Sequence, residues 1–252
     1  MRILVVADIH ANRAALDAIS EPHDVCLCLG DTVEYGPEPA ACVDWVRHNA
    51  HHSVRGNHDH GVVQNVDLVG TGGFRYLTMV TRQPTLAALD ASQRRFLATR
   101  PTTQMVTLDG LRFLLVHATP RDPLDEYTPT DPKAWAMRLN GIKADFVLVG
   151  HTHQQFTFNV GQSILLNPGS VGLPRDGDPR ARYAIIENGV VQLKQVPYSI
   201  ADTLAGLATM EIDPKAKSML ADVYRFGRYM NGHTNGNGNG QSRPLLELEP
   251  TT

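Results

Sequence analysis

The sequence Phe-Val-Leu-Val-Gly-His-Thr-His occupies residues 146–153. Its four leading apolar residues predict a buried parallel strand, because a strand covered on both faces is apolar at every position. Gly150 frees the backbone where the strand ends. His151 and His153 then fall at the carboxyl edge of a sheet, where open α/β proteins place their sites. A His-x-His pair alone is more often a hydrogen-bonded pair than a metal site, so its meaning depends on the rest of the chain.

Four other predicted apolar strands also end in side chains that bind metals. They are followed by Asp8-Ile9-His10, Gly30-Asp31, Gly56-Asn57-His58 and His117. Buried strands have no structural need for polar groups at one edge, and unpaired Asp and His gathered there would lose their hydration. A divalent metal removes that conflict, because it binds deprotonated carboxylate and neutral imidazole together. The five strand ends therefore indicate a metal site.

The number of candidate ligands points to two ions rather than one. The strand ends supply two Asp, one Asn and four His, with His58 in addition. A catalytic site for one ion uses about four protein ligands at most, so this set suits two ions with one shared carboxylate. Oxygen and nitrogen ligands without thiolate favour Mn, Fe or Zn.

The bulk composition narrows the class of protein. The chain has 252 residues, of which 42% are hydrophobic and 19% charged, an ordinary globular balance. A net charge of −3 gives no overall basic surface for nucleic acid or anionic membrane. Cys26, Cys28 and Cys42 are too few for a disulfide framework, and we expect them to be small buried residues. No stretch has the length of a signal peptide or a membrane span, so a cytoplasmic protein is expected.

Apolar periodicity and turn residues predict a chain that alternates strands and helices. Strands are predicted at 3–7, 25–29, 53–55, 103–108, 111–116, 146–149, 155–160, 163–166, 182–187 and 190–196. Helices are predicted at 11–20, 37–48, 74–80, 91–99, 132–140, 199–210 and 214–228, with residues 61–73 irregular. We expect one domain over residues 1–230. Residues 231–252 are rich in Asn and Gly and poor in apolar side chains, which predicts a flexible low-complexity tail.

In this order, the motifs resemble those of the calcineurin-like metallophosphoesterase superfamily. The resemblance covers residues 3–196 and rests on Asp8-x-His10, Gly30-Asp31, Gly56-Asn57-His58-Asp59, His117 and Gly150-His151-x-His153. Residues 117–127 and 167–170 resemble loops of its small bacterial and archaeal phosphodiesterase branch, although Ala118-Thr119-Pro120 replaces the more usual Gly-Ser-Pro. The resemblance implies an α/β fold, a four-layer α/β/β/α sandwich of two mixed β-sheets.

The same resemblance implies a role for each strand-end residue. A first ion is implied at Asp8, His10 and His153, and a second at Asn57, His117 and His151, with Asp31 bridging the two. His58 would bind no metal. It would instead protonate the leaving-group oxygen or stabilise charge on the phosphoryl group.

Supporting residues follow less directly. Glu34 stands where an acidic residue orients the catalytic histidine of protein serine/threonine phosphatases, and a solvated loop glutamate fits the sequence equally well. Tyr35 occupies the next position, where those phosphatases carry a phosphate-binding arginine, which disfavours a protein phosphatase. Arg175 either reaches the substrate from its loop or forms a surface salt bridge. Asp59 is expected to hydrogen-bond within its own turn.

The implied reaction is hydrolysis of a phosphoester, with a phosphodiester expected, by in-line attack of a hydroxide that bridges two metal ions. Mn²⁺ is the expected cofactor, with Fe, Zn or Ni as alternatives. The expected substrate is a small phosphoester or a nucleotide-type molecule. No membrane or nucleic-acid partner is expected, and a homo-oligomer is left open.

Other functions remain open at this point. A phosphomonoesterase and a symmetrical dinucleoside polyphosphate hydrolase would use the same motifs. The retromer subunit with this fold is a non-catalytic scaffold, but it departs at the catalytic histidine, whereas His58 and every implied ligand are present here. A DNA nuclease, as in the recombination-repair relatives, is disfavoured by the acidic charge balance.

Overall fold

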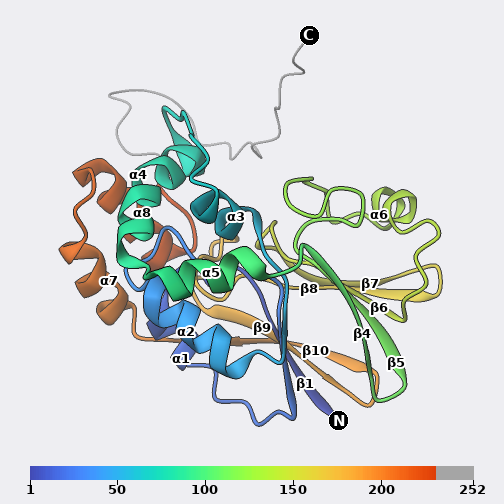
Figure 1. Cartoon of the computed structure of the whole chain (residues 1–252). Helices are drawn as coiled ribbons and strands as arrows, with labels where there is room; N and C mark the ends of the chain where they lie inside the picture. The colour runs from blue at the N-terminus through green and yellow to red at the C-terminus, as the bar shows by residue number, and fades with distance from the viewer. Residues whose placement is uncertain (231–252) are drawn as a thin grey trace, which may run out of the picture.

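Two mixed β-sheets packed face to face form the centre of the fold in the computed structural model, which describes residues 1–230 (Figure 1). The first sheet has the strand order β10-β9-β1-β2-β3. Its strands are β1 (Arg2–Val6), β2 (Val25–Cys28), β3 (His52–Ser53), β9 (Ala181–Glu187) and β10 (Val190–Val196). Strands β1, β2 and β3 run parallel, and β9 pairs antiparallel with both β1 and β10.

The second sheet has the order β4-β5-β6-β8-β7. Its strands are β4 (Thr103–Leu108), β5 (Leu111–Val116), β6 (Phe146–Leu148), β7 (Gln155–Val160) and β8 (Ser163–Pro168). The three central strands β5, β6 and β8 are parallel, and an antiparallel strand closes each edge. Within each sheet the central strands run parallel. Their carboxyl ends therefore lie at one edge of that sheet.

Successive side chains of a strand point to opposite faces of the sheet, and both faces are covered by apolar side chains. In β1, Ile3 and Val5 pack between the sheets against Phe113 and Leu148, whereas Leu4 and Val6 pack on the outer face. A strand buried on both faces needs apolar residues at odd and even positions alike, as the sequence pattern indicates. Cys26, Cys28 and Cys42 are buried and unpaired in the outer cluster, as predicted.

Helices cover the outer faces and complete the four layers (Figure 1). They are α1 (Arg13–Asp17), α2 (Pro39–Asn49), α3 (Asn57–Val63), α4 (Gly73–Ala88), α5 (Ala91–Thr99), α6 (Pro132–Arg138), α7 (Ile200–Thr209) and α8 (Pro214–Phe226). Leu16 of α1 and Val46 of α2 pack on the first sheet, and Trp135 of α6 packs on the second. Helices α4, α7 and α8 share a further apolar cluster that contains Leu77 and Leu220. The predicted α/β/β/α sandwich of two mixed sheets is confirmed.

Four segments differ from the sequence prediction, and the first is helix α1, which covers only Arg13–Asp17 rather than residues 11–20. Residues 57–63 form helix α3 where a strand end and an irregular segment were predicted, because the Asp59 carboxylate accepts the Gly56 N–H at 3.1 Å and starts a helix. Strand β3 covers only His52–Ser53 rather than 53–55. Helix α4 continues to Ala88 instead of ending near residue 80, with Pro84 inside it.

No helix among residues 1–230 combines the length and the apolar character that a membrane crossing requires. The prediction of a single domain over these residues stays a prediction. The predicted flexible tail, 231–252, lies outside the described residues.

Candidate metal centre

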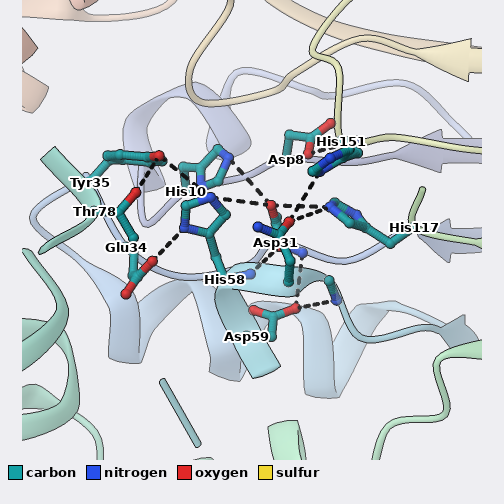
Figure 2. Close-up of polar contacts among 12 residues, drawn as sticks. Asp8, His10, Asp31, Glu34, Tyr35, His58, Asp59, Thr78, His117 and His151 are labelled. Atoms are coloured by element: carbon teal, nitrogen blue, oxygen red, sulfur yellow. Dashed lines mark hydrogen bonds and ion pairs between the residues drawn. The ribbon is translucent and has the colours of Figure 1, made fainter. Parts of the chain in front are cut away.

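The predicted strand ends do meet at one edge of the two sheets. The first sheet delivers Asp8 and His10 after β1, Asp31 after β2, and Asn57 and His58 at the start of α3; the second delivers His117 after β5, and His151 and His153 after β6. Figure 2 shows side chains from both sheets turned toward Asp31. Apart from the half-buried Asn57, these residues are at most 7% exposed. The contact between the sheets therefore brings together residues up to 145 positions apart, counted from Asp8 to His153.

One group of donors lies around His10. The Nε2 atoms of His10 and His153 are 3.1 Å apart, and the Oδ1 atom of Asp8 is 3.7 Å from His153 Nε2. Donor atoms of all three residues lie within 4.8 Å of one another. Ligands about 2.1 Å from one ion are roughly 3.0–3.4 Å apart in octahedral or tetrahedral geometry, so the group has the dimensions of a metal site.

A second group lies around Asn57. Its Oδ1 atom is 3.0 Å from His117 Nε2 and 3.2 Å from His151 Nδ1. Asp31 Oδ2 is 3.2 Å from the same His117 Nε2 and 3.8 Å from His10 Nε2 in the other group. Asp31 is thus the carboxylate that both groups share.

Backbone carbonyls fix the orientation of three imidazoles. His10 Nδ1 donates to Val33 O at 3.1 Å, His117 Nδ1 to Leu29 O at 2.8 Å and His153 Nδ1 to Leu173 O at 2.5 Å. A carbonyl only accepts, so each neutral ring carries its proton on Nδ1 and presents a lone pair on Nε2. Histidines that bind metals are oriented in this way by a partner for the other ring nitrogen.

Two features show that the residues fit a divalent metal. The Nε2 lone pairs of His10 and His153 face each other at 3.1 Å, an arrangement that neutral rings do not adopt without a cation between them. Asp8 Oδ2 is buried and has no hydrogen-bond partner among the described residues. An unsatisfied buried carboxylate oxygen is costly, and metal coordination satisfies it.

The backbone at the site is strained. Asp8, His10, Asp31, Glu34, Tyr35, His151 and His153 all have φ between 47° and 68°, in the left-handed region that non-glycine residues avoid. Each such residue costs about 1–3 kcal/mol, and strain of this kind collects at functional sites. The seven conformations are held because the neighbouring backbone groups are bonded: His10 N donates to Asp31 O and Asp8 N to Gly30 O, both at 3.0 Å.

Glycine is required where two of these loops touch. A Cβ atom on Gly56 would lie 2.0 Å from Asp31 Oδ1, and one on Gly30, whose φ is 93°, would lie 2.4 Å from Gly56 N. The absence of a side chain at both positions therefore permits the close approach of the Gly30-Asp31 loop to the start of α3.

Residues 167–170 tie the two sheets together behind the site. The side chain of Asn167 donates to Gly150 O at 2.7 Å, and the Ser170 hydroxyl donates to Asp8 O at 2.7 Å. These bonds hold the loops that carry His151 and Asp8. At the sequence level, Asn167 and Ser170 were distinguished only by the family resemblance.

Burial and mutual charge shift the pKa values of the metal-free donors. Burial raises the pKa of Asp8 to about 7, only partly offset by His117. Burial alone would raise the pKa of Asp31 as well, but the charges of His117 and His58 hold it well below its usual value. Burial and then the charge of His117 lower the pKa of His151 to about 3. His151 is therefore neutral and Asp31 ionised near pH 7, the forms that metals bind.

His58 lies beside the metal donors and is held by a buried ion-pair chain. Its Nδ1–H donates to Glu34 Oε2, and Arg82 of α4 donates from Nε to Glu34 Oε1 at 2.6 Å (Figure 2 shows the His58–Glu34 pair). Burial would lower the pKa of His58, but the Asp31 and Glu34 carboxylates outweigh it and raise the pKa. Glu34 is fully buried, so the alternative of a solvated loop glutamate is wrong.

Tyr35 closes the other side of His58. Its hydroxyl lies 3.4 Å from His58 Nε2 and 2.7 Å from the Thr78 hydroxyl, and the ring is 1% exposed. Asp59, in contrast, points away from the donors and accepts the N–H groups of Asp31 at 2.9 Å, Thr32 at 2.8 Å and Gly56 at 3.1 Å. Its expected bond within the turn is confirmed.

Arg175 stands at the rim of the site, and no carboxylate of residues 1–230 lies within ion-pair distance of it. Its guanidinium carbon is 3.8 Å from the ring centre of Phe74 and 6.0 Å from that of Tyr35. Its Nη1 lies 3.5 Å from the Tyr127 hydroxyl, and the Tyr127 ring packs 4.7 Å from His151. The salt-bridge alternative for Arg175 is therefore not what the described residues show.

Some residues near the site were missed at the sequence level. They are Phe74, Thr78, Arg82 and Tyr127. Arg82 looks like a surface residue of an amphipathic helix, and only its 6% exposure reveals its role. The remaining histidines outside the site, His23, His48, His51, His52 and His60, contribute no donor to the candidate metal groups among residues 1–230.

Known proteins share this combination of fold and motifs. Residues 1–189 match the model of the calcineurin-like phosphoesterase superfamily domain. A metallophosphoesterase of Sphaerobacter thermophilus is 32% identical, and its crystal structure superposes with a TM-score of 0.73 over 88% of this chain and 98% of that one.

Two further relatives are similar over most of their length. The uncharacterised protein MJ0912 of Methanocaldococcus jannaschii is 29% identical over 223 residues, 79% of this chain and 88% of its own. The phosphodiesterase YfcE of Escherichia coli K12 is 26% identical over 208 residues, 77% of this chain and 91% of its own. The family model covers well over half of the chain, and the fold and the donor set agree with it. The chain therefore belongs to the calcineurin-like phosphoesterase superfamily and is a phosphoester hydrolase.

Proposed function

We propose that this hydrolase is a phosphodiesterase with a dinuclear metal centre and a small phosphodiester substrate. The observation that carries the proposal is the position of Asp31, whose Oδ2 atom faces donors of both groups at 3.2 and 3.8 Å. One carboxylate shared between two donor groups is the arrangement that a pair of ions needs. The name of the similar phosphodiesterase YfcE supports a diester over a monoester.

The proposed ligands divide into two sets. Asp8, His10 and His153 hold the first ion, Asn57, His117 and His151 hold the second, and Asp31 bridges them. In this proposal His151 and His153 serve different ions although Thr152 alone separates them. Mixed oxygen and imidazole donors suit Mn²⁺, Fe, Zn or Ni, and we propose Mn²⁺. Two such ions, when bound, polarise the phosphoryl group and activate a water nucleophile.

The protein's own contribution begins with the position of His58. Because Glu34 accepts the Nδ1–H, Nε2 is the free ring nitrogen, and it faces the site beside Tyr35 and 3.9 Å from Asp31 Oδ2. An imidazolium in this place can give its Nε2 proton to a departing alkoxide or aryloxide oxygen. Its raised pKa favours the protonated form that this step requires.

The Arg82–Glu34 pair keeps that geometry. Glu34 has no access to solvent, and Arg82 binds both of its oxygens, at 2.6 and 3.3 Å, and Val66 O at 2.7 Å. The carboxylate is thereby held against rotation, and it orients the imidazole as an acidic group does in other acid–base pairs. Glu34 is thus proposed to act through His58 and not on the substrate.

The proposal is tested by metal reconstitution. Protein stripped with chelator should hydrolyse neither bis-p-nitrophenyl phosphate nor p-nitrophenyl phosphate. Addition of Mn²⁺ should restore diester hydrolysis and bind at two ions per chain. A panel with Fe, Zn and Ni, and with dinucleoside polyphosphates, identifies the preferred metal and substrate. Metal-loaded protein that cleaves no phosphoester in the panel would contradict the proposal, and one ion per chain would contradict its dinuclear part.

A further inference from the structure

Arg175 is a half-buried cation without a counter-charge among residues 1–230. Its Nε atom is shielded from solvent and has no hydrogen-bond partner among the same residues. The acidic residues next to it in the chain are already paired: Asp176 with Arg182 at 2.7 Å, and Asp178 with Arg180. An unpaired and partly desolvated guanidinium is unfavourable, so its position calls for an anion that arrives from outside.

Aromatic rings hold the guanidinium in place. It lies 3.8 Å from the centre of the Phe74 ring, on the first turns of α4, and the Tyr127 hydroxyl is 3.5 Å from Nη1. Stacking on an aromatic face uses none of the five N–H donors in the plane of the guanidinium, so those not directed at Tyr127 stay available for an oxyanion. The contact with Phe74 therefore fixes the orientation of Arg175 without using its hydrogen bonds.

The loop that carries Arg175 is joined to the metal donors. Gly172 N donates to Asp8 O at 3.1 Å, and Leu173 O accepts from His153 Nδ1 at 2.5 Å, two residues before Arg175. The far side of the loop is bonded to the end of α8, where Gly177 N donates to Gly227 O at 3.1 Å. Arg175 is therefore held at a fixed position relative to the proposed first ion.

Tyr35 supplies no positive charge on its side of the site, and Arg175 of another loop does. The position after Glu34 carries a tyrosine whose hydroxyl is committed to Thr78, so it offers no cation to a phosphate. Arg175 lies 6.0 Å from the Tyr35 ring and brings a guanidinium to that side of the site from another loop.

We propose that Arg175, stacked on Phe74 and next to Tyr127, binds a non-bridging phosphate oxygen of the substrate. The inference rests on the proposed function, since it concerns the same site. The ligand class is a phosphate oxyanion, bound by the planar N–H donors of Arg175. Tyr127, 53% exposed and packed against His151, forms the opposite wall of this anion site.

The test measures binding of inorganic phosphate to the Mn²⁺-loaded full-length chain by calorimetry, together with hydrolysis of bis-p-nitrophenyl phosphate. Arg175→Met keeps the contact with Phe74 and removes the charge. It should weaken phosphate binding and lower kcat/KM by about 10- to 100-fold, the loss expected for one charge-assisted contact. Metal content and melting temperature should stay at the wild-type values. Arg175→Lys should recover part of the binding, since it restores the charge but not the planar donors.

Arg180→Met is the matched control, because it removes an equal charge from the same loop but from a guanidinium already paired with Asp178. It should leave phosphate binding unchanged. Wild-type protein that binds no phosphate, or Arg175→Met protein that binds it as tightly as wild type, would overturn the inference, as would an equal loss in Arg180→Met. Wild-type protein that binds phosphate through Arg175 but hydrolyses no phosphoester would refute the proposed function alone.

Discussion

The side chains proposed to hold the metal ions and those at the rim of the site differ in burial and in the elements that carry them. The proposed ligands Asp8, His10, Asp31, Asn57, His117, His151 and His153 are called the metal cradle below; the rim consists of Phe74, Tyr127 and Arg175. Cradle side chains follow strands or start α3, are buried apart from the half-buried Asn57, and in five of seven cases depend on a left-handed backbone conformation. Rim side chains come from α4 and two loops, and Tyr127 is 53% exposed.

This difference indicates which side chains the fold must place precisely and which can come from variable loops. Metal ligands must be placed within tenths of an ångström, and only sheet edges braced by backbone hydrogen bonds hold them under strain. Rim residues need only reach the substrate, so loops can supply them. We therefore expect changes in the cradle to abolish metal binding and changes in the rim to alter affinity for the substrate.

The largest effect is expected from Asp31→Ala. Loss of the shared carboxylate removes a ligand from both proposed ions, so the purified variant should hold less than one ion per chain. Hydrolysis of bis-p-nitrophenyl phosphate should fall by about 10,000-fold or more. Metal content is measured by elemental analysis. Asp145→Ala, which removes an exposed carboxylate from the second sheet, is the control and should keep both ions. An Asp31→Ala protein that still binds two metal ions per chain would contradict the proposed difference between cradle and rim.

His58→Ala should separate catalysis from metal binding. His58 is proposed to donate a proton from Nε2 and to bind no metal, so kcat should fall by about 100- to 1,000-fold at unchanged metal content. A diester with a more acidic leaving group should be affected less, because its oxygen leaves without a proton. If the variant loses an ion, His58 belongs to the metal cradle instead.

Arg82→Met should act mainly on stability. It leaves the buried carboxylate of Glu34 without its cation, and breaking one side of a buried ion pair costs about 3–5 kcal/mol. Urea unfolding measures the loss in the free energy of unfolding. Arg112→Met, which breaks the exposed pair with Asp145, is the control and should cost about 1 kcal/mol or less. Equal losses would show that the Glu34 pair is no better buried than a surface pair.

The metal cradle also predicts opposite pH trends with and without metal. Burial would lower the pKa of His117, but Asp31 raises it to about 9. A raised histidine pKa gives stability that is complete below the unfolded value of about 6.5 and is lost as the pH rises through 9. Asp8 has a pKa raised to about 7, so its ionisation as the pH rises also lowers the stability of the fold.

The melting temperature of the metal-free protein should therefore fall by a few degrees between pH 6.5 and 9. The added stabilisation by Mn²⁺ should grow over the same range, because metal binding requires these groups deprotonated. Melting curves with and without Mn²⁺ measure both trends. Asp31→Ala, which lacks the charge that raises the pKa of His117, should show a flatter metal-free trend. A metal-free melting temperature that rises with pH would contradict this account.

The smallest effect is expected at the rim from Tyr127→Phe. The change removes only a hydroxyl 3.5 Å from Arg175 Nη1, a long and exposed contact, so kcat/KM should change by about threefold or less. The aromatic wall over His151 remains. A larger loss, measured in steady-state kinetics, would make the Tyr127 hydroxyl a direct contact to the substrate.

The metal cradle could be predicted almost completely from the sequence. Each donor follows a short apolar strand, and Asp8, Asp31 and His117 stand out because a buried strand seldom ends in such residues. Parallel strands of one sheet have their carboxyl ends at one edge, so residues that directly follow such strands lie near one another in space. The assignment of each donor to an ion, in contrast, came from a resemblance and remains a proposal.

Helix α3 and the extent of α4 could not be predicted in this way. Gly56 and Asp59 read as turn residues, yet the carboxylate of Asp59 binds N–H groups from two loops and starts a helix. Helix α4 was predicted to end near residue 80, yet it continues past Pro84 to Ala88. The N–H groups of Asp31 and Thr32 that Asp59 binds are far away in the chain, and local propensity does not contain such contacts.

The sequence alone thus determined the alternation of strands and helices and the strand ends at which the candidate donors stand, since these follow from apolar periodicity and residue type, whereas the sandwich arrangement was implied by the family resemblance. Only the tertiary structure decided that Glu34 is buried against Arg82, that the Tyr35 hydroxyl is bonded to Thr78, and that Arg175 faces the site with no counter-charge from residues 1–230. The physical reason is that burial and pairing of a charge depend on which segments pack together, and loops of different length and origin meet here only after the two sheets have closed on each other.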